Sequence, residues 1–113
     1  MPYIEIKTTA ELTAKNKTSM KEKLGRDIAL IPGKSESYLM LCFEGGLDMY
    51  FKGDNKPCAF AQVMIFGKSD KKNYEKLTAA ITETIHSELG VEPDRVYVKY
   101  EECEHWGCNG VNF

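Results

Sequence analysis

An extended segment, a helical segment and a second extended segment follow one another twice in this sequence of 113 residues. Apolar residues recur every three or four positions over 20–31 and again over 74–89, a spacing that predicts two amphipathic helices. Each helix lies between two segments whose β-branched, aromatic and other apolar residues are typical of strands. The four strand segments are Tyr3–Thr8, Tyr38–Glu44, Ala59–Phe66 and Arg95–Glu101. The pattern therefore predicts two β-α-β units.

The two units can be aligned at an offset of 57 residues, which places Met20 on Leu77. Two such units joined edge to edge form a four-stranded mixed sheet with two helices on one face. We therefore predict an α+β fold, with residues 1–113 as one domain and pseudo-repeats at about 2–44 and 59–101.

Turn-forming residues indicate where the helices end and where the two units are joined. The first helix is expected to end at Pro32-Gly33 and the second at Gly90. Residues 45–57 are rich in Gly, Asp and Lys, so we expect a loop there, with a short strand at 49–51.

The predicted sheet is apolar on both faces at its second and third strands. In the second strand Leu39, Leu41 and Phe43 alternate with Met40 and Cys42, and the third strand alternates in the same way. Two helices cover only one face, and a sheet that is apolar on both faces is normally buried on both. We therefore expect another copy of the chain to cover the second face.

Charge and hydropathy exclude two classes of partner. The formal charge of −2 and the pI near 5.7 do not fit a nucleic-acid-binding surface, which needs clustered basic residues. No apolar run is long enough to cross a membrane, and the charged, alternating start of the chain is unlike a signal peptide. The expected location is the cytoplasm.

The four cysteines are too few and too scattered to predict a disulfide framework. Cys103, His105 and Cys108 lie close together in sequence, and a zinc site with a further ligand is one interpretation. Reduced cysteines that pack as small apolar side chains are the favoured alternative. We therefore predict no metal ligands.

The sequence begins Met1-Pro2-Tyr3. Because methionine ahead of a small residue is usually removed, we expect Pro2 to become the N-terminal residue. Its nitrogen would then be a free secondary amine, which is a base that no internal proline can provide.

Several short motifs occur in an order that resembles the macrophage migration inhibitory factor family of the tautomerase superfamily, including its microbial members. The motifs are Met1-Pro2, Pro32-Gly33-Lys34-Ser35-Glu36-Ser37-Tyr38, Pro57-Cys58-Ala59, Gly67-Lys68, Pro93-Asp94-Arg95-Val96-Tyr97-Val98 and Trp106-Gly107-Cys108-Asn109-Gly110, with Phe113 at the end. The resemblance covers the whole chain. It implies a homotrimer with active sites at the subunit boundaries and keto–enol tautomerisation of phenylpyruvate-like or hydroxyphenylpyruvate-like acids. It also implies that no metal or organic cofactor takes part.

The resemblance also implies roles for individual residues. Pro2 would be the proton-transferring base, and Lys34 would bind the substrate carboxylate and lower the pKa of the Pro2 amine. Phe66 would offer its backbone N–H to the ligand, and Tyr97 would enter the pocket from a neighbouring subunit. The remaining aromatic positions, at the rim and wall of the pocket, are Tyr38 and Phe113.

Four positions depart from the family pattern, and one of them is Cys108, which replaces a tryptophan. Lys99 replaces an asparagine that contacts ligand, and it could either add a second cation or point outward. Trp106 replaces a smaller aliphatic residue near the pocket mouth and is expected to narrow it. Cys58 lacks the second cysteine of a Cys-x-x-Cys motif, so we expect no dithiol–disulfide chemistry there.

Two further interpretations stand beside the enzyme. Relatives act as cytokines or cytokine mimics that leave cells without a signal peptide, so the chain could be a secreted ligand for an extracellular receptor. A non-catalytic trimer is favoured if the mature chain keeps Met1.

Overall fold

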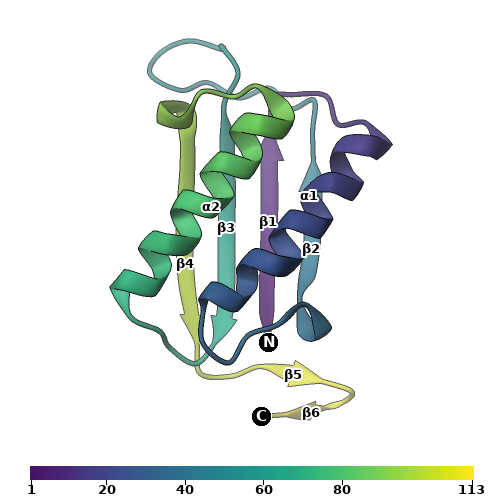
Figure 1. Ribbon diagram of the computed structural model, residues 1–113, viewed down its shortest axis with the longest axis vertical. Coiled ribbons are helices and arrows are strands. Elements are labelled where there is room, and N and C mark those ends of the chain that lie inside the picture. Colours follow the sequence, from purple (N-terminus) through teal and green to yellow (C-terminus); the bar gives the residue numbers. More distant parts are fainter.

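The computed structural model describes residues 1–113, and Figure 1 shows two helices packed across one face of a sheet, with a small hairpin at the C-terminal end. The helices are α1 (Ala14–Asp27) and α2 (Lys71–Leu89). The strands are β1 (Pro2–Thr8), β2 (Met40–Glu44), β3 (Ala59–Phe66), β4 (Val96–Cys103), β5 (Gly107–Cys108) and β6 (Val111–Asn112). Short 3₁₀ turns occur at Ile28–Leu30, Glu36–Tyr38 and Pro93–Arg95.

The main sheet has four strands in the order β2-β1-β3-β4. In each β-α-β unit the two strands run parallel, β1 beside β2 and β3 beside β4, and the units join through the antiparallel pair of β1 and β3. The predicted α+β fold with a mixed sheet and two helices on one face is confirmed. The boundaries of the pseudo-repeats remain a prediction.

The hydrophobic core lies between the helices and the covered face of the sheet. Every second residue of β1 and β3 points into it, and the helical spacing of α1 and α2 supplies the other side. Its fully buried members include Ile4, Ile6, Val63, Met20, Leu24, Leu77, Ile81 and Ile85. Burial of each such large side chain contributes about 1.5–3 kcal/mol, so the core fixes the register of the two central strands.

The ends of three elements differ from the prediction. α1 ends at Asp27, and a 3₁₀ turn rather than further α-helix leads toward Pro32. β2 begins at Met40 instead of Tyr38, because residues 36–38 form another 3₁₀ turn. β4 runs from Val96 to Cys103 and is thus longer than expected at its C-terminal end. The predicted end of α2 is correct, since Gly90 stops it with a φ of 70°.

The predicted strand at 49–51 is wrong. Only an isolated bridge joins Phe51 to Asp54, across a tight turn in which Lys52 and Gly53 have φ values of 54° and 83°. Conversely, the hairpin of β5 and β6 was not predicted, although Asn109-Gly110 is a strong sequence signal for such a turn.

The second face of the sheet is not covered by any element of the chain (Figure 1). It is less apolar than expected, because β1 and β4 add Glu5, Lys7, Lys99 and Glu101 to the apolar side chains of β2 and β3. Separately, neither helix has the length and hydrophobicity needed to span a bilayer.

Candidate active site

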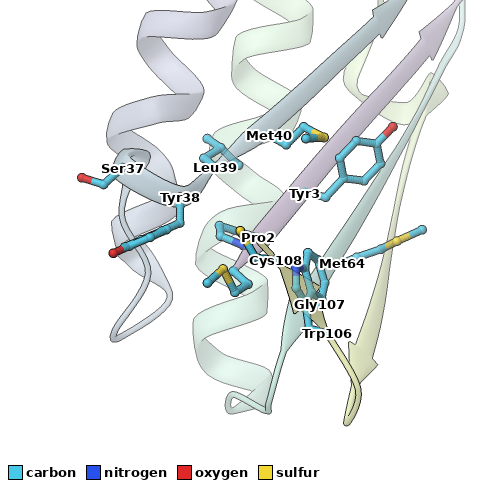
Figure 2. A pocket seen from close by; sticks show the side chains of 11 residues that line it. Pro2, Tyr3, Ser37, Tyr38, Leu39, Met40, Met64, Trp106, Gly107 and Cys108 are labelled. Carbon is cyan, nitrogen blue, oxygen red and sulfur yellow. The ribbon is translucent and has the colours of Figure 1, made fainter. Parts of the chain in front are cut away.

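A cavity of about 530 Å³ opens at the start of β1, between the residues that lead into β2 and the C-terminal hairpin (Figure 2). Most of its wall is apolar. Its lining residues are Met1, Pro2, Tyr3, Ser37, Tyr38, Leu39, Met40, Met64, Trp106, Gly107 and Cys108.

Pro2 lies at the bottom of the sheet as the first residue of its central strand. It pairs with Ile65 of β3 and is buried. A proline is tolerated at this place because the first residue of a strand does not have to donate a ladder hydrogen bond. Figure 2 shows the Pro2 ring between Tyr38 on one side and Trp106 and Cys108 on the other. The central strand thus fixes the position of the first residues of the chain.

Lys34 and the backbone of Phe66 meet beside this end of the chain. The Lys34 ammonium donates a hydrogen bond of 2.7 Å to the Phe66 carbonyl oxygen. The Phe66 N–H donates one of 3.1 Å to the Met1 carbonyl oxygen. One cation and one backbone donor therefore converge on the segment that holds Pro2.

The terminal amine has a perturbed acidity in this environment. Partial burial, the positive charge of Lys34 and a hydrogen bond with it all lower the pKa of the Met1 amine below its ordinary value of 8.0. Burial and a nearby cation both disfavour the charged form of an amine. An amine at this place is thus more readily neutral, as a general base must be.

Two aromatic side chains line the same cavity as Met1 and Pro2, and two more lie nearby. Tyr38 lines the cavity with 65% of its surface exposed, and Trp106 lines the opposite wall. The Trp106 carbonyl accepts a hydrogen bond of 3.0 Å from the Phe113 N–H, and the rings of Phe113 and Phe66 lie 6.2 Å apart. The structure therefore gathers six of the predicted site residues in one region, namely Pro2, Lys34, Tyr38, Phe66, Trp106 and Phe113.

Tyr97 and Lys99 lie elsewhere in the same chain. Tyr97 pairs with Phe60 and Lys99 with Gln62, whereas Pro2 pairs with Ile65. Five residues of strand separate Phe60 from Ile65, which is about 17 Å. Within one chain neither side chain belongs to the cavity.

The sequence did not identify Tyr3, Met40 and Met64 as lining residues. All three point to the uncovered face, and Tyr3 pairs with Met40 on one side and Met64 on the other. The alternation of residues along each strand predicts that the three side chains lie on one face of the sheet. Only the register between the strands shows that they are neighbours. Tyr3 also donates a 2.8 Å hydrogen bond to Glu5, which, together with burial, raises the pKa of the Tyr3 hydroxyl.

Cysteine and histidine side chains do not assemble into a metal site. No group of three or more His, Cys, Asp or Glu side chains is placed to hold an ion, so Cys103, His105 and Cys108 do not form one. All four cysteines are free, and Cys58 is buried.

Comparison with known proteins shows one family. A sequence model of the family described as Macrophage migration inhibitory factor (MIF) matches residues 1–113. Mouse macrophage migration inhibitory factor is 30% identical over 96 residues, which cover 80% of this chain and 81% of the mouse protein. The macrophage migration inhibitory factor homolog of Brugia malayi is 27% identical over 92% of this chain and 90% of its own length.

Solved structures agree with the sequence matches. The crystal structure of Leishmania major MIF2 superposes with a TM-score of 0.94 and is 26% identical, and the match covers 100% of this chain and 97% of that one. Similarity therefore extends over the core, the cavity and the C-terminal hairpin alike.

Proposed function

Because the chain belongs to the macrophage migration inhibitory factor family of the tautomerase superfamily, we propose that it is a phenylpyruvate-type keto–enol tautomerase whose base is the Pro2 amine. The supporting observation is the convergence of the chain's first residues, the Lys34 ammonium and the Phe66 N–H beside an apolar, aromatic cavity.

Removal of Met1 would produce the base and part of the binding site together. It converts the Pro2 nitrogen from an amide to an amine. It also releases the Phe66 N–H, which now bonds to the Met1 carbonyl oxygen, and it empties the part of the cavity that Met1 fills. The freed donor and Lys34 then suit an anionic group of a ligand.

The substrate proposed for this site is a small aromatic keto or enol acid. Its carboxylate lies at Lys34 and the Phe66 N–H, and its ring packs against Tyr38 and Trp106, with Phe113 behind Phe66. The neutral Pro2 amine takes the proton from the carbon next to the keto group, and the double bond moves to leave negative charge on the carbonyl oxygen. The protonated Pro2 amine then gives that proton to the oxygen, which forms the enol and restores the neutral amine. The reverse sequence turns the enol into the ketone, and no cofactor takes part.

A homotrimer is part of this proposal. Tyr97 lies far from the Pro2 of its own chain but is 58% exposed, so a neighbouring copy could receive it in its pocket. Lys99, on the uncovered face, would approach the same boundary as a second cation or point away from it.

The experiment is to block the Pro2 amine while every other residue of the chain stays unchanged. Mass spectrometry first establishes that Met1 is absent. An alanine inserted before Pro2, or acetylation of the terminus, is then expected to abolish the ultraviolet absorbance change of phenylpyruvate tautomerisation. Unchanged turnover in either blocked protein would exclude Pro2 as the base.

A second candidate function is a cytokine-like secreted ligand, favoured by the relatives that are named as macrophage migration inhibitory factors. It would act on an extracellular receptor after leaving the cytoplasm without a signal peptide. Binding of a Pro2→Gly variant to receptor-bearing cells separates the two functions, because signalling that survives the loss of turnover does not depend on catalysis.

A further inference from the structure

Arg95 is the centre of an unusually complete set of contacts at the end of the sheet opposite Pro2. Only 11% of its side chain is exposed, although arginine is rarely buried without partners. Its Nε donates to the Pro57 carbonyl oxygen at 2.9 Å. Its Nη2 donates to the carbonyl oxygens of Phe51 and Lys56 at 3.2 and 3.0 Å, and to Asp54 Oδ1 at 2.8 Å.

These bonds fix the loop between β2 and β3, which Figure 1 shows at the end of the molecule away from the N-terminus. Four acceptors from residues 51–57 bind one planar guanidinium, a geometry that lysine cannot reproduce. The Lys56 N–H and the charge of Arg95 also lower the pKa of the Asp54 carboxyl. The tight turn at Lys52-Gly53 and the Phe51–Asp54 bridge complete the structure of this loop.

The fixed loop holds an aromatic ring against Tyr97. The Arg95 guanidinium lies 5.2 Å from the centre of the Phe51 ring, within the range of a cation–π contact. The Phe51 ring in turn stands edge-on to the Tyr97 ring, with centroids 4.8 Å apart and an interplanar angle of 89°. Arg95 is the last residue of the 3₁₀ turn Pro93–Arg95 and Tyr97 is the second residue of β4, and the Phe51 ring contacts both of them.

The Tyr97 ring is exposed to solvent and is also restrained by its neighbours. Tyr97 keeps more than half of its surface free, yet one edge is set by Phe51, whose own position depends on Arg95. A ring that serves only the stability of its own chain would gain more by burial. A preset orientation reduces the cost of ordering when a surface is used in recognition.

From these contacts we infer that Arg95 and Phe51 are positioning residues, which hold Tyr97 ready to form a wall of the pocket in a neighbouring copy of the chain. The inference rests on the proposed function only for the placement of Tyr97 between copies. The loop at 45–57 thereby becomes part of the substrate site of another subunit, although it lies at the far end of its own.

The experiment uses Trp106, the single tryptophan of the chain, which lines the pocket beside Pro2. Acrylamide quenching of its fluorescence reports how well that pocket is closed. We expect Arg95→Lys and Phe51→Leu to increase quenching in the same direction as Tyr97→Ala. We also expect them to raise KM for phenylpyruvate about three- to tenfold with little change in kcat, as the loss of one aromatic contact implies.

Control variants test whether the changes in quenching and KM come from the contacts among Arg95, Phe51 and Tyr97. Asp94→Asn, next to Arg95 in sequence, removes only an exposed ion pair with Lys52 and should change neither quenching nor KM. The double variant Phe51→Leu/Tyr97→Ala should equal Tyr97→Ala alone, because the two residues act as a unit. Phe51→Leu keeps an apolar side chain, and its melting temperature establishes that the protein remains folded.

The quenching series can contradict the inference independently of whether the proposed tautomerase function is correct. If Tyr97→Ala changes quenching and the two positioning variants do not, the inference is wrong. If Tyr97→Ala leaves quenching unchanged, Tyr97 does not reach a neighbouring pocket and the inference is again wrong. If the wild-type protein lacks tautomerase activity, the proposed function fails, but the quenching series still decides the inference.

Discussion

At the residue scale, the proposed mechanism depends on a terminal amine whose acidity is set by its neighbours. Lys34 follows a turn at Gly33 with a φ of 83°, and its bond to the Phe66 carbonyl oxygen uses one of its three donors. Two donors remain for a ligand carboxylate. One side chain can therefore bind the anion and also lower the pKa of the base.

The pH dependence of a Lys34→Met variant separates these two roles. The charge of Lys34 lowers the pKa of the Met1 amine, and we expect it to act in the same direction on the Pro2 amine once Met1 is removed. In the proposed mechanism the neutral Pro2 amine is the base, so loss of this charge should move the acidic limb of the kcat profile to higher pH. KM for phenylpyruvate should rise as well, since the carboxylate loses its cation. A higher KM with an unmoved acidic limb would show that Lys34 binds substrate without tuning the base.

The sequence identified some residues of the candidate site and missed others. The motifs pointed to Pro2 and Lys34, and the structure places both at one end of the sheet. Met40 and Met64 belong to the cavity only because Tyr3 pairs with both of them, and such long-range register is not encoded in any local pattern.

At the element scale, the helices and the core strands followed from periodicity because long apolar repeats have one stable arrangement. Their ends did not. The first turn after α1 and the turn before β2 are 3₁₀, and the ends of elements are the part of a structure that periodicity specifies least. The predicted strand at 49–51 failed because Arg95, distant in sequence, ties this segment into a loop.

Gly45, in the connection after β2, provides a test of packing. A Cβ at Gly45 would lie 2.6 Å from the Ala10 carbonyl oxygen and 2.6 Å from Leu12 Cγ, and the backbone there cannot move freely. Gly45→Ala should therefore destabilise the fold by about 1–3 kcal/mol.

The matched control is Gly25→Ala in α1. The new methyl group there meets only the Glu36 carboxylate, which is flexible and half exposed, and the helix gains up to about 1 kcal/mol in propensity. Urea unfolding of both variants measures the difference. Equal loss of stability in the two would contradict the contacts described for Gly45.

At the scale of the whole molecule, features of the sheet support the proposal that one copy is an incomplete unit. Its second face is uncovered, its outer strands β2 and β4 each leave one edge unpaired, and Tyr97 lies at the opposite end from the cavity. Exposed strand edges readily pair with other chains. The apolar residues on both faces of the predicted strands indicated that a second copy would cover the sheet. The sequence could not show that charged residues of β1 and β4 lie on that same face.

Sedimentation equilibrium should give a species of three times the chain mass of 12.8 kDa. Because Tyr97 and the cavity come from different copies in this arrangement, dilution below the dissociation constant should lower activity per chain as the trimer disappears. The variant Asp94→Asn serves as a control with an unchanged assembly. Constant specific activity in a monomeric preparation would exclude a site shared between subunits.

The bond between Phe66 and the Met1 carbonyl oxygen has a consequence for biosynthesis. The start of β1 is closed in by β3, which the ribosome makes some sixty residues later, at about 5–20 residues per second. For several seconds an aminopeptidase therefore meets the nascent polypeptide before β3 can pair with its first residues, and we expect removal of Met1 to be faster then than after folding. The ratio of chains with and without Met1, and with it the proposed tautomerase activity, should then depend on the speed of translation.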